Sequence, residues 1–312
     1  VYAFMNAADI SEQAAEDIQA FLSEEHSDFD TAAIGEECEY SSDAYYEEIM
    51  PGDEEWQEGW RDFEKTIKSE ARFFSRTAAD QLSKLFDTID LMTTVNGKQL
   101  VVDAGPGTDC TQLFRARVFQ SDDTLKQAMM RPDKELAAPP SHFANAGRMN
   151  AKGISVFYGA TSVDTALAEV RPPVGSQVAL AQFDIIRPIK LLDLTALSEL
   201  HEAGSIFDTG YAYRLSRMMF LRKLSSRIAR PVMPDDQESE YLPTQAIADF
   251  LATEGKVHLD GILYPSVQVD DAGLNVVLFH KSSRCKKLDI PDGTEIHAYT
   301  CLLYTSDAAD EQ

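Results

Sequence analysis

The sequence predicts an α+β protein in which a mainly helical N-terminal domain precedes a domain built on a mixed β-sheet. Two observations support this prediction. Apolar residues recur at helical spacing over residues 3–23 and again from Trp60 to about Leu91. After Asn96-Gly97 the pattern changes to short β-rich runs separated by glycine and proline turns. We therefore assign residues 1–95 to an acidic helical accessory domain and residues 96–300 to the sheet domain.

Composition narrows the possible functions. The chain has 312 residues and a formal net charge of −24, and its first 70 residues hold 21 acidic and 3 basic side chains. This balance argues against non-specific binding to nucleic acid, which needs an excess of Lys and Arg, and leaves the acidic region as either a solvated surface or a docking face for a basic partner. No apolar run is long enough to span a bilayer, so no membrane role is expected. The four scattered cysteines predict a reduced, cytoplasmic protein.

The sheet domain reads as an ordered series of strands and helices. Residues 120–143 are expected to be a loop because three prolines discourage a continuous helix there. Helices are predicted over Tyr211–Ala229 and from Leu242 to about Thr253, where Pro243 suits the first turn and Gly255 ends the helix. The predicted strands are Val101–Val102, Leu113–Val118, Ile154–Tyr158, Val178–Ile185, Lys190–Leu194, Gly261–Tyr264 and Asn275–Phe279, with further edge strands within Lys286–Tyr299.

The segment Ala144–Val170 combines a glycine-punctuated loop, a strand and the opening of a helix. The strand is expected to end at Gly159, and Ser162 is the expected N-cap of the helix that follows. Arg148, Tyr158 and Glu169 come from these three consecutive elements at separations of ten and eleven residues. A cation, an aromatic ring and a carboxylate are suited to a pocket for an anionic, partly aromatic ligand.

Each candidate site residue also has an ordinary structural interpretation. Arg148 could hold a carboxylate or pyrophosphate with its planar fork, or could be a surface arginine in a turn. Glu169 could stabilise a developing cation, or form a salt bridge. Tyr158 could be an edge tyrosine, Ser266 could cap a turn after Pro265, and Arg115 could either contact a phosphate or lie on an exposed strand face. The six histidines are dispersed, so no metal site and no histidine-based triad is expected.

Together, five motifs in order resemble those of the RES-domain family. They are LFRAR at 113–117, GRMNAKG at 147–153, VFYGA at 156–160, ALAE at 166–169 and DGILYPS at 260–266. The resemblance spans about residues 100–285. The arginine, glutamate and serine for which the family is named match Arg148, Glu169 and Ser266, and its additional site tyrosine matches Tyr158. Met149 stands where an aromatic residue is common, a departure that affects packing more than charge.

The resemblance implies an ADP-ribosyltransferase-like α+β fold around a central cleft, and an enzyme that consumes NAD. Many members are toxins of RES–Xre toxin–antitoxin pairs that hydrolyse or phosphorolyse NAD, so an antitoxin becomes a possible partner. In that role Glu169 would stabilise the ribose cation, Arg148 and Arg115 would hold the phosphates, Tyr158 would stack on nicotinamide or ribose, and Ser266 would position the ribose or Arg148. Two alternatives stay open: a protein ADP-ribosyltransferase, and a non-catalytic nucleotide-binding module.

Two further expectations concern the ends of the chain. The N-terminal region resembles the helical segment of HEPN-associated RES proteins but has no Arg-x4–6-His motif, so no ribonuclease activity is expected. Its acidic surface is expected to fold against the basic helix 211–229 and to gate the cleft. Residues 301–312 resemble translated read-through sequence, and we expect this tail to lie outside the native fold.

Overall fold

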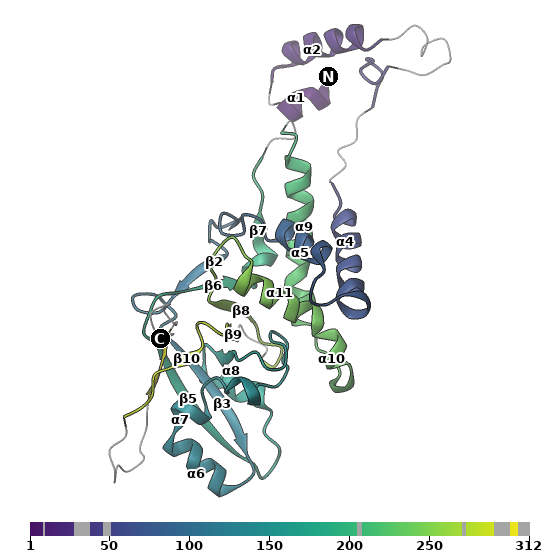
Figure 1. Cartoon of the computed structure of the whole chain (residues 1–312). Coiled ribbons are helices and arrows are strands. Elements are labelled where there is room, and N and C mark those ends of the chain that lie inside the picture. The colour runs from purple at the N-terminus through teal and green to yellow at the C-terminus, as the bar shows by residue number, and fades with distance from the viewer. Residues whose placement is uncertain are drawn as a thin grey trace. The chain divides into compact units, whose positions relative to one another are not determined.

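The computed structural model describes residues 1–8, 10–27, 38–45, 51–204, 208–269, 273–289 and 300–304. The chain divides into two compact units (Figure 1). One comprises Val1–Gly52 and Gly204–Tyr213, and the other comprises Asp53–Ala203 and Arg214–Gln312. The domain boundary predicted between residues 95 and 96 stays a prediction. It was drawn from the change in sequence pattern, whereas the two units are defined by contacts in space.

Over the described residues between 2 and 25, the first unit has two helices where the sequence predicts one. Helix α1 (Tyr2–Ala8) and helix α2 (Glu12–Glu25) replace the expected continuous helix over residues 3–23. Ser11 ends the continuity because its side chain accepts a hydrogen bond from Ala14 N and caps α2. Gln19 of α2 is buried and donates to Ser41 O at 2.9 Å, which ties the helix to the segment that follows it.

The helical part of the second unit is built around α9 (Tyr211–Ala229). The predicted helix from Trp60 to Leu91 is interrupted: α4 (Glu54–Lys65) continues into the π-helix η1 (Thr66–Glu70), and α5 (Arg76–Leu85) begins after Ser75, whose side chain caps it. The rings of Trp56 and Trp60 in α4 pack against Phe220 of α9. Helix α11 (Leu242–Thr253), as predicted, and the short α10 (Gln237–Glu240) complete this layer (Figure 1).

The basic face of α9 contacts acidic and carbonyl groups of the same unit. Lys223 Nζ lies 2.9 Å from Asp53 Oδ1, and Arg214 Nε lies 2.6 Å from Glu202 Oε1. Arg217 donates to Asp87 O at 3.0 Å and Arg222 Nε donates to Leu200 O at 3.0 Å. The predicted contact between the acidic region and helix 211–229 is therefore present at Asp53.

The second unit contains a nine-stranded mixed sheet within the described residues, as predicted for an α+β fold. Its order is β10-β11-β5-β3-β4-β9-β8-β6-β2, with β5–β11 and β6–β8 parallel and the other pairs antiparallel. A separate two-stranded sheet joins β1 (Thr93–Thr94) to β7 (Leu200–His201). The strands of the large sheet are β2 (Val101–Ala104), β3 (Gln112–Phe119), β4 (Phe157–Ala160), β5 (Gln177–Ile185), β6 (Ile189–Asp193), β8 (Gly261–Pro265), β9 (Leu274–Leu278), β10 (Arg284–Cys285) and β11 (Thr300–Tyr304).

One face of the sheet holds the main apolar core, and part of its cover was not predicted. The core includes Phe157, Phe183 and Leu191, and residues of the 120–143 segment pack on it. That segment forms helices α6 (Asp122–Met130) and α7 (Pro132–Glu135), so the expected loop is wrong for these residues. Ser121 caps α6, and Pro132 starts α7 in the first turn, where its missing N–H costs nothing.

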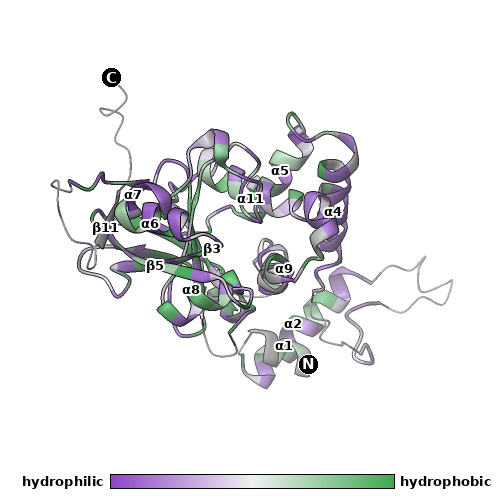
Figure 2. Cartoon of the chain, turned by 90° about the horizontal axis from the view of Figure 1, so that it is seen from below, coloured by the Kyte–Doolittle hydropathy of each residue, from purple (hydrophilic) through white to green (hydrophobic). Residues whose placement is uncertain are grey.

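The other face is covered by α8 (Val163–Val170), which approaches β3 and β4 closely. Figure 2 shows α8 beside the strands of the sheet. Ala116, Ala160 and Ala166 are buried together, and their small side chains allow this close approach. Strand β4 covers residues 157–160, so the prediction that Gly159 ends it is wrong. A Cβ at Gly159 would lie 2.7 Å from the ring of Phe157 and 3.2 Å from Phe114 O, so glycine allows β3 to pair here.

The C-terminal prediction is tested only in part by these residues. Thr300–Tyr304 form β11 and pair parallel with β5, so the beginning of the expected tail is a strand of the sheet. Most of the predicted edge strands over 286–299, and residues 305–312, lie outside the described residues. No helix of the part that the structure describes has the length and apolar character needed to cross a membrane.

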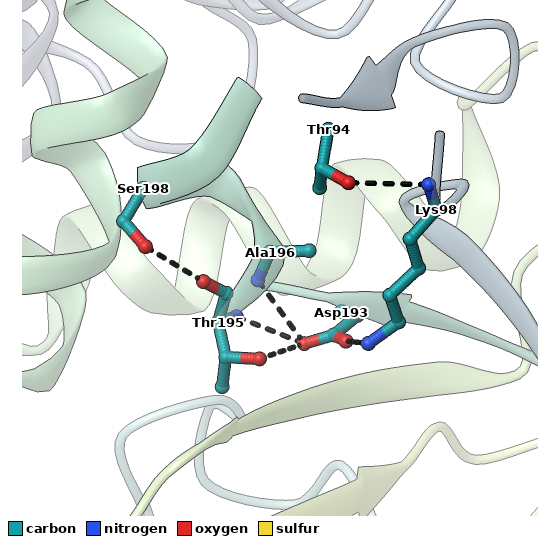
Figure 3. A network of polar contacts seen from close by, with 6 residues as sticks. All are labelled: Thr94, Lys98, Asp193, Thr195, Ala196 and Ser198. Carbon is teal, nitrogen blue, oxygen red and sulfur yellow. Dashed lines mark hydrogen bonds and ion pairs between the residues drawn. The ribbon is translucent and has the colours of Figure 1, made fainter. Parts of the chain in front are cut away.

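A buried carboxylate anchors the end of β6. Asp193 is 2% exposed, and its Oδ1 accepts hydrogen bonds from Thr195 N at 2.9 Å and Thr195 Oγ1 at 2.5 Å (Figure 3). Its Oδ2 lies 2.6 Å from Lys98 Nζ. Lys98 N in turn donates to Thr94 Oγ1, so the network joins β6 to the turn after β1.

Candidate functional site

A cavity of about 750 Å³ opens beside α8, and its walls come from β3, β4, β8, β9 and the segments around Arg148 and Tyr241. Its size is in the range of small-molecule sites, roughly 300–1,000 Å³. Arg115, Arg148, Tyr158 and Glu169 all line it. Ser266 joins them through a hydrogen bond to Glu169. The structure thus brings together all five residues that the sequence singled out.

Glu169 lies in the last turn of α8, where the helix places it over the sheet. The helix starts as predicted: Ser162 has extended backbone angles and its hydroxyl accepts from Thr165 N at 3.2 Å. Glu169 Oε1 accepts two hydrogen bonds, from Ser266 Oγ at 2.5 Å and Asn275 Nδ2 at 2.7 Å. Oε2 has no hydrogen-bond partner among the described residues. One oxygen is therefore fixed, and the other remains available to a ligand.

Ser266 supports Glu169 rather than Arg148. Its backbone N donates to Gly273 O at 2.7 Å, which holds the segment after β8 against the approach to β9. Its hydroxyl accepts from Gln268 N at 3.1 Å, so its own proton is directed to Glu169. The expectation that Ser266 contacts Arg148 is not met by the described contacts, and a contact with ribose stays a prediction.

Arg148 belongs to a loop that α11 holds in place. Thr244 Oγ1 donates to Arg148 O at 2.5 Å, and Gln245 Nε2 donates to Gly147 O at 2.8 Å. The guanidinium lies over the ring of Tyr241, 5.1 Å from its centroid. Its Nη1 donates to Ile228 O and Arg230 O, at the carboxyl end of α9. Nε and Nη2 have no partner among the described residues, so half of the fork remains for an anion.

Tyr158 is a fixed wall of the cavity. Its hydroxyl accepts from Met149 N at 3.0 Å and donates to Asn150 Oδ1 at 2.8 Å. A Cβ at Gly147 would lie 2.7 Å from this hydroxyl, which explains the glycine before Arg148. Burial raises the pKa of Tyr158 to about 12, so the phenol stays protonated at neutral pH. Tyr158 is suited to shaping the cavity and not to accepting a proton.

The side chain of Arg115 reaches the cavity from β3, at the place where two neighbouring strands of the sheet pair over the shortest length. Strands β3 and β4 share a single paired position, Phe114 with Ala160, over their described lengths. Arg115 Nη1 donates to Ala137 O at 3.2 Å, and its guanidinium lies 5.3 Å from the ring centroid of Phe157. Burial and the neighbouring charge of Arg117 lower the pKa of Arg115 to about 10, which still leaves it cationic at neutral pH.

Several lining residues were not predicted from the sequence. Asn275 contacts Glu169, while Tyr241 and Tyr264 add aromatic surface. Arg171 also lines the cavity, with its Nε 2.7 Å from Gln268 Oε1, and adopts a left-handed conformation with φ of 40°. Burial, with the nearby Tyr158 and Glu169, raises the pKa of Tyr264 well above its ordinary value. Tyr264 stands two residues before Ser266 in the same motif, and β8 ends between them at Pro265.

Comparison with known proteins adds one finding. The family model of the RES domain matches residues 117–300, more than half of the chain. The matched range contains Arg148, Tyr158, Glu169 and Ser266, and Arg115 lies just before it. No curated protein matches the sequence. Among the described residues no group of three or more His, Cys, Asp or Glu side chains is arranged to hold a metal ion.

Proposed function

The chain belongs to the RES-domain family, a family of ADP-ribosyltransferase-like fold associated with NAD, and we propose that it is an enzyme that cleaves the bond between nicotinamide and ribose in NAD. The observation that supports this most is the state of Glu169. Its Oε1 is held by two neutral donors, and its Oε2 has no described partner in a cavity that also contains arginine and tyrosine side chains.

The chemistry of this bond suits such a site. Nicotinamide leaves as a neutral molecule from a ring that is already cationic, so no strong acid is needed to protonate it. Positive charge then develops on the ribose, and a fixed carboxylate stabilises that charge. The described residues that line the cavity include no histidine, and Tyr158 holds its proton at neutral pH. Glu169 is therefore the residue to which we assign the chemical step.

Arg148 and Arg115 are suited to binding the phosphate groups of NAD. NAD carries a pyrophosphate, which planar guanidinium groups bind through paired hydrogen bonds. Arg148 has Nε and Nη2 without described partners, and Arg115 remains cationic although it is largely buried. We propose that these two residues hold the phosphates and that Tyr158 stacks on nicotinamide or ribose.

The acceptor decides the subclass of enzyme. We propose water or phosphate as the acceptor, since both are small enough to enter the cavity of about 750 Å³ together with part of the NAD molecule. Loss of NAD would arrest the cell that makes the protein, so we propose that it acts as a toxin restrained by an antitoxin.

Incubating the purified chain with NAD and quantifying nicotinamide tests the proposal. We expect nicotinamide release, with free ADP-ribose in plain buffer if water is the acceptor and phosphorylated ADP-ribose on adding phosphate if phosphate is. NAD labelled in the adenosine part distinguishes the protein-modifying alternative, in which the label becomes protein-bound. Saturable NAD binding with no nicotinamide release would contradict the proposal and favour a binding module.

A further inference from the structure

Asn275 is a polar side chain in an otherwise apolar strand. It belongs to β9, whose other four residues are Leu274, Val276, Val277 and Leu278. It pairs with Tyr264 on β8 and with Ala160 on β4, so it lies in the interior of the sheet, and it is 6% exposed. Burying an amide without a hydrogen bond is unfavourable, so the hydrogen-bond partner of Asn275 explains why an amide is present in this strand.

That partner is Glu169. Asn275 Nδ2 lies 2.7 Å from Oε1, the oxygen that also accepts from Ser266 Oγ. No other side-chain hydrogen bond of Asn275 occurs among the described residues. Two donors on one oxygen restrict rotation of the carboxylate about its last bond, which directs Oε2 away from them and toward the cavity.

The neutrality of the donor matters as much as its position. An ammonium or guanidinium at this place would compensate the carboxylate charge that the ribose cation needs, whereas an amide orients the carboxylate and leaves its charge intact. On the premise of the proposed function, we infer that Asn275 is a positioning residue for the reaction. It holds Glu169 through Oε1 so that a fully charged Oε2 addresses the ribose.

The pH profile of turnover in Asn275→Asp and Asn275→Leu tests this inference. Aspartate has nearly the shape of asparagine, and when protonated it donates to Glu169 as the amide does. When both carboxyl groups are ionised they repel, because the two oxygens lie at hydrogen-bond distance. We expect Asn275→Asp to have kcat within about threefold of wild type at low pH and to lose tenfold or more as pH rises, a limb that wild type lacks. Asn275→Leu should be at least tenfold slower at every pH.

Three outcomes separate the inference from the proposed function. If wild type releases no nicotinamide at any pH, the proposed function fails. If wild type is active and Asn275→Asp either follows the wild-type profile or is folded and inactive at all pH values, the inference is wrong. Urea unfolding of Asn275→Leu, Glu169→Met and the double variant gives a readout that needs no turnover, because Leu removes the donor and Met removes the acceptor of this hydrogen bond. We expect the effects on the unfolding constant to deviate from additivity by about tenfold; additive effects would overturn the inference.

Discussion

Glu169 and Asp193 are two carboxylates with opposite environments. Asp193 uses both oxygens: Oδ1 accepts from Thr195 N, Thr195 Oγ1 and Ala196 N, and Oδ2 is paired with Lys98 Nζ (Figure 3). Glu169 uses one oxygen, with neutral donors only, and its other oxygen has no partner among the described residues. Asp193 stands at the end of a strand, and Glu169 at the end of a helix beside a cavity.

The difference shows that the number of hydrogen bonds does not by itself identify a functional carboxylate. Asp193 joins two segments of chain and its charge is compensated by a cation, so its interactions stabilise the fold. Glu169 is fixed in orientation while its charge is uncompensated by the contacts that fix it. Glu169 is exposed whereas Asp193 is buried, so water can solvate the second oxygen of Glu169 until a ligand or a reaction uses its charge.

The largest expected effect on stability is at Asp193. Asp193→Asn removes the charge and forces an amide nitrogen against N–H donors or Lys98, which leaves buried groups unpaired. We expect a loss of about 2–3 kcal/mol in the free energy of unfolding, measured by urea denaturation. The kcat of the folded fraction for NAD should stay within about twofold of wild type. A tenfold fall in kcat would mean that Asp193 is not purely structural.

Ser266→Ala should affect activity more than stability. It removes one of the two donors to Glu169 Oε1 and leaves Asn275 in place. A hydrogen bond to a charged group contributes about 1.5–3 kcal/mol, part of which Asn275 can retain, so we expect kcat to fall about tenfold. Ser266→Thr keeps the hydroxyl and is the matched control. Unchanged kcat in Ser266→Ala would show that Glu169 does not need this donor.

Lys98→Met removes the cation that compensates the charge of Asp193. Asp193 is then held by neutral hydrogen-bond donors only, as Glu169 is. Lys98 is half exposed, so the ion pair is partly screened by water. We expect a loss of about 1 kcal/mol in the free energy of unfolding. The loss should diminish at high salt, and NAD turnover should not change. An effect of 3 kcal/mol or more would indicate that the pair behaves as a buried one.

The smallest effect on the pH profile of kcat is expected for Tyr158→Phe. Because the pKa of Tyr158 is raised from its usual value near 10 to about 12, the phenol keeps its proton below pH 10 in the folded state. The pH profile of kcat should then be the same for both proteins up to pH 9.5. Between pH 10 and 12 the folded state binds more protons than the unfolded chain, so the stability of wild type falls as pH rises. That contribution to the fall should be missing in Tyr158→Phe. An alkaline limb of kcat below pH 9, absent from the variant, would contradict this role.

The part of the site that depends on local pattern could be predicted. Ser162 as N-cap and the grouping of Arg148, Tyr158 and Glu169 follow from spacing within Ala144–Val170. The strand before Ser162 was predicted over residues 154–158 but lies at Phe157–Ala160. Asn275 could not be found this way, because its partner Glu169 lies 106 residues away and one polar residue in an otherwise apolar strand has no local signal of function. Which residues meet across a sheet depends on register, which a single sequence does not determine.

The fold was predictable to the same extent. The helix Tyr211–Ala229 was correct to the residue, whereas the long helices predicted over 3–23 and from Trp60 to Leu91 are interrupted. The helices over 120–143 were missed because the prolines there were taken to discourage a continuous helix. The basic face of α9 was visible in the sequence. Its contacts with Asp53 and Asp87 join residues that are 170 and 130 positions apart in the sequence, so they are identified only in the folded chain. The proposed gating of the cleft by the acidic region stays a prediction, and no described residue of 1–92 lines the cavity.

The most direct test of the account compares nicotinamide release from NAD by wild type and by Glu169→Gln. The substitution keeps the shape of the side chain and removes the charge. We expect wild type to release nicotinamide and Glu169→Gln to be slower by a factor of about 100 to 1,000, with an unchanged midpoint of thermal unfolding. Equal rates from the two proteins would show that the charge of Glu169 does not drive the cleavage of NAD.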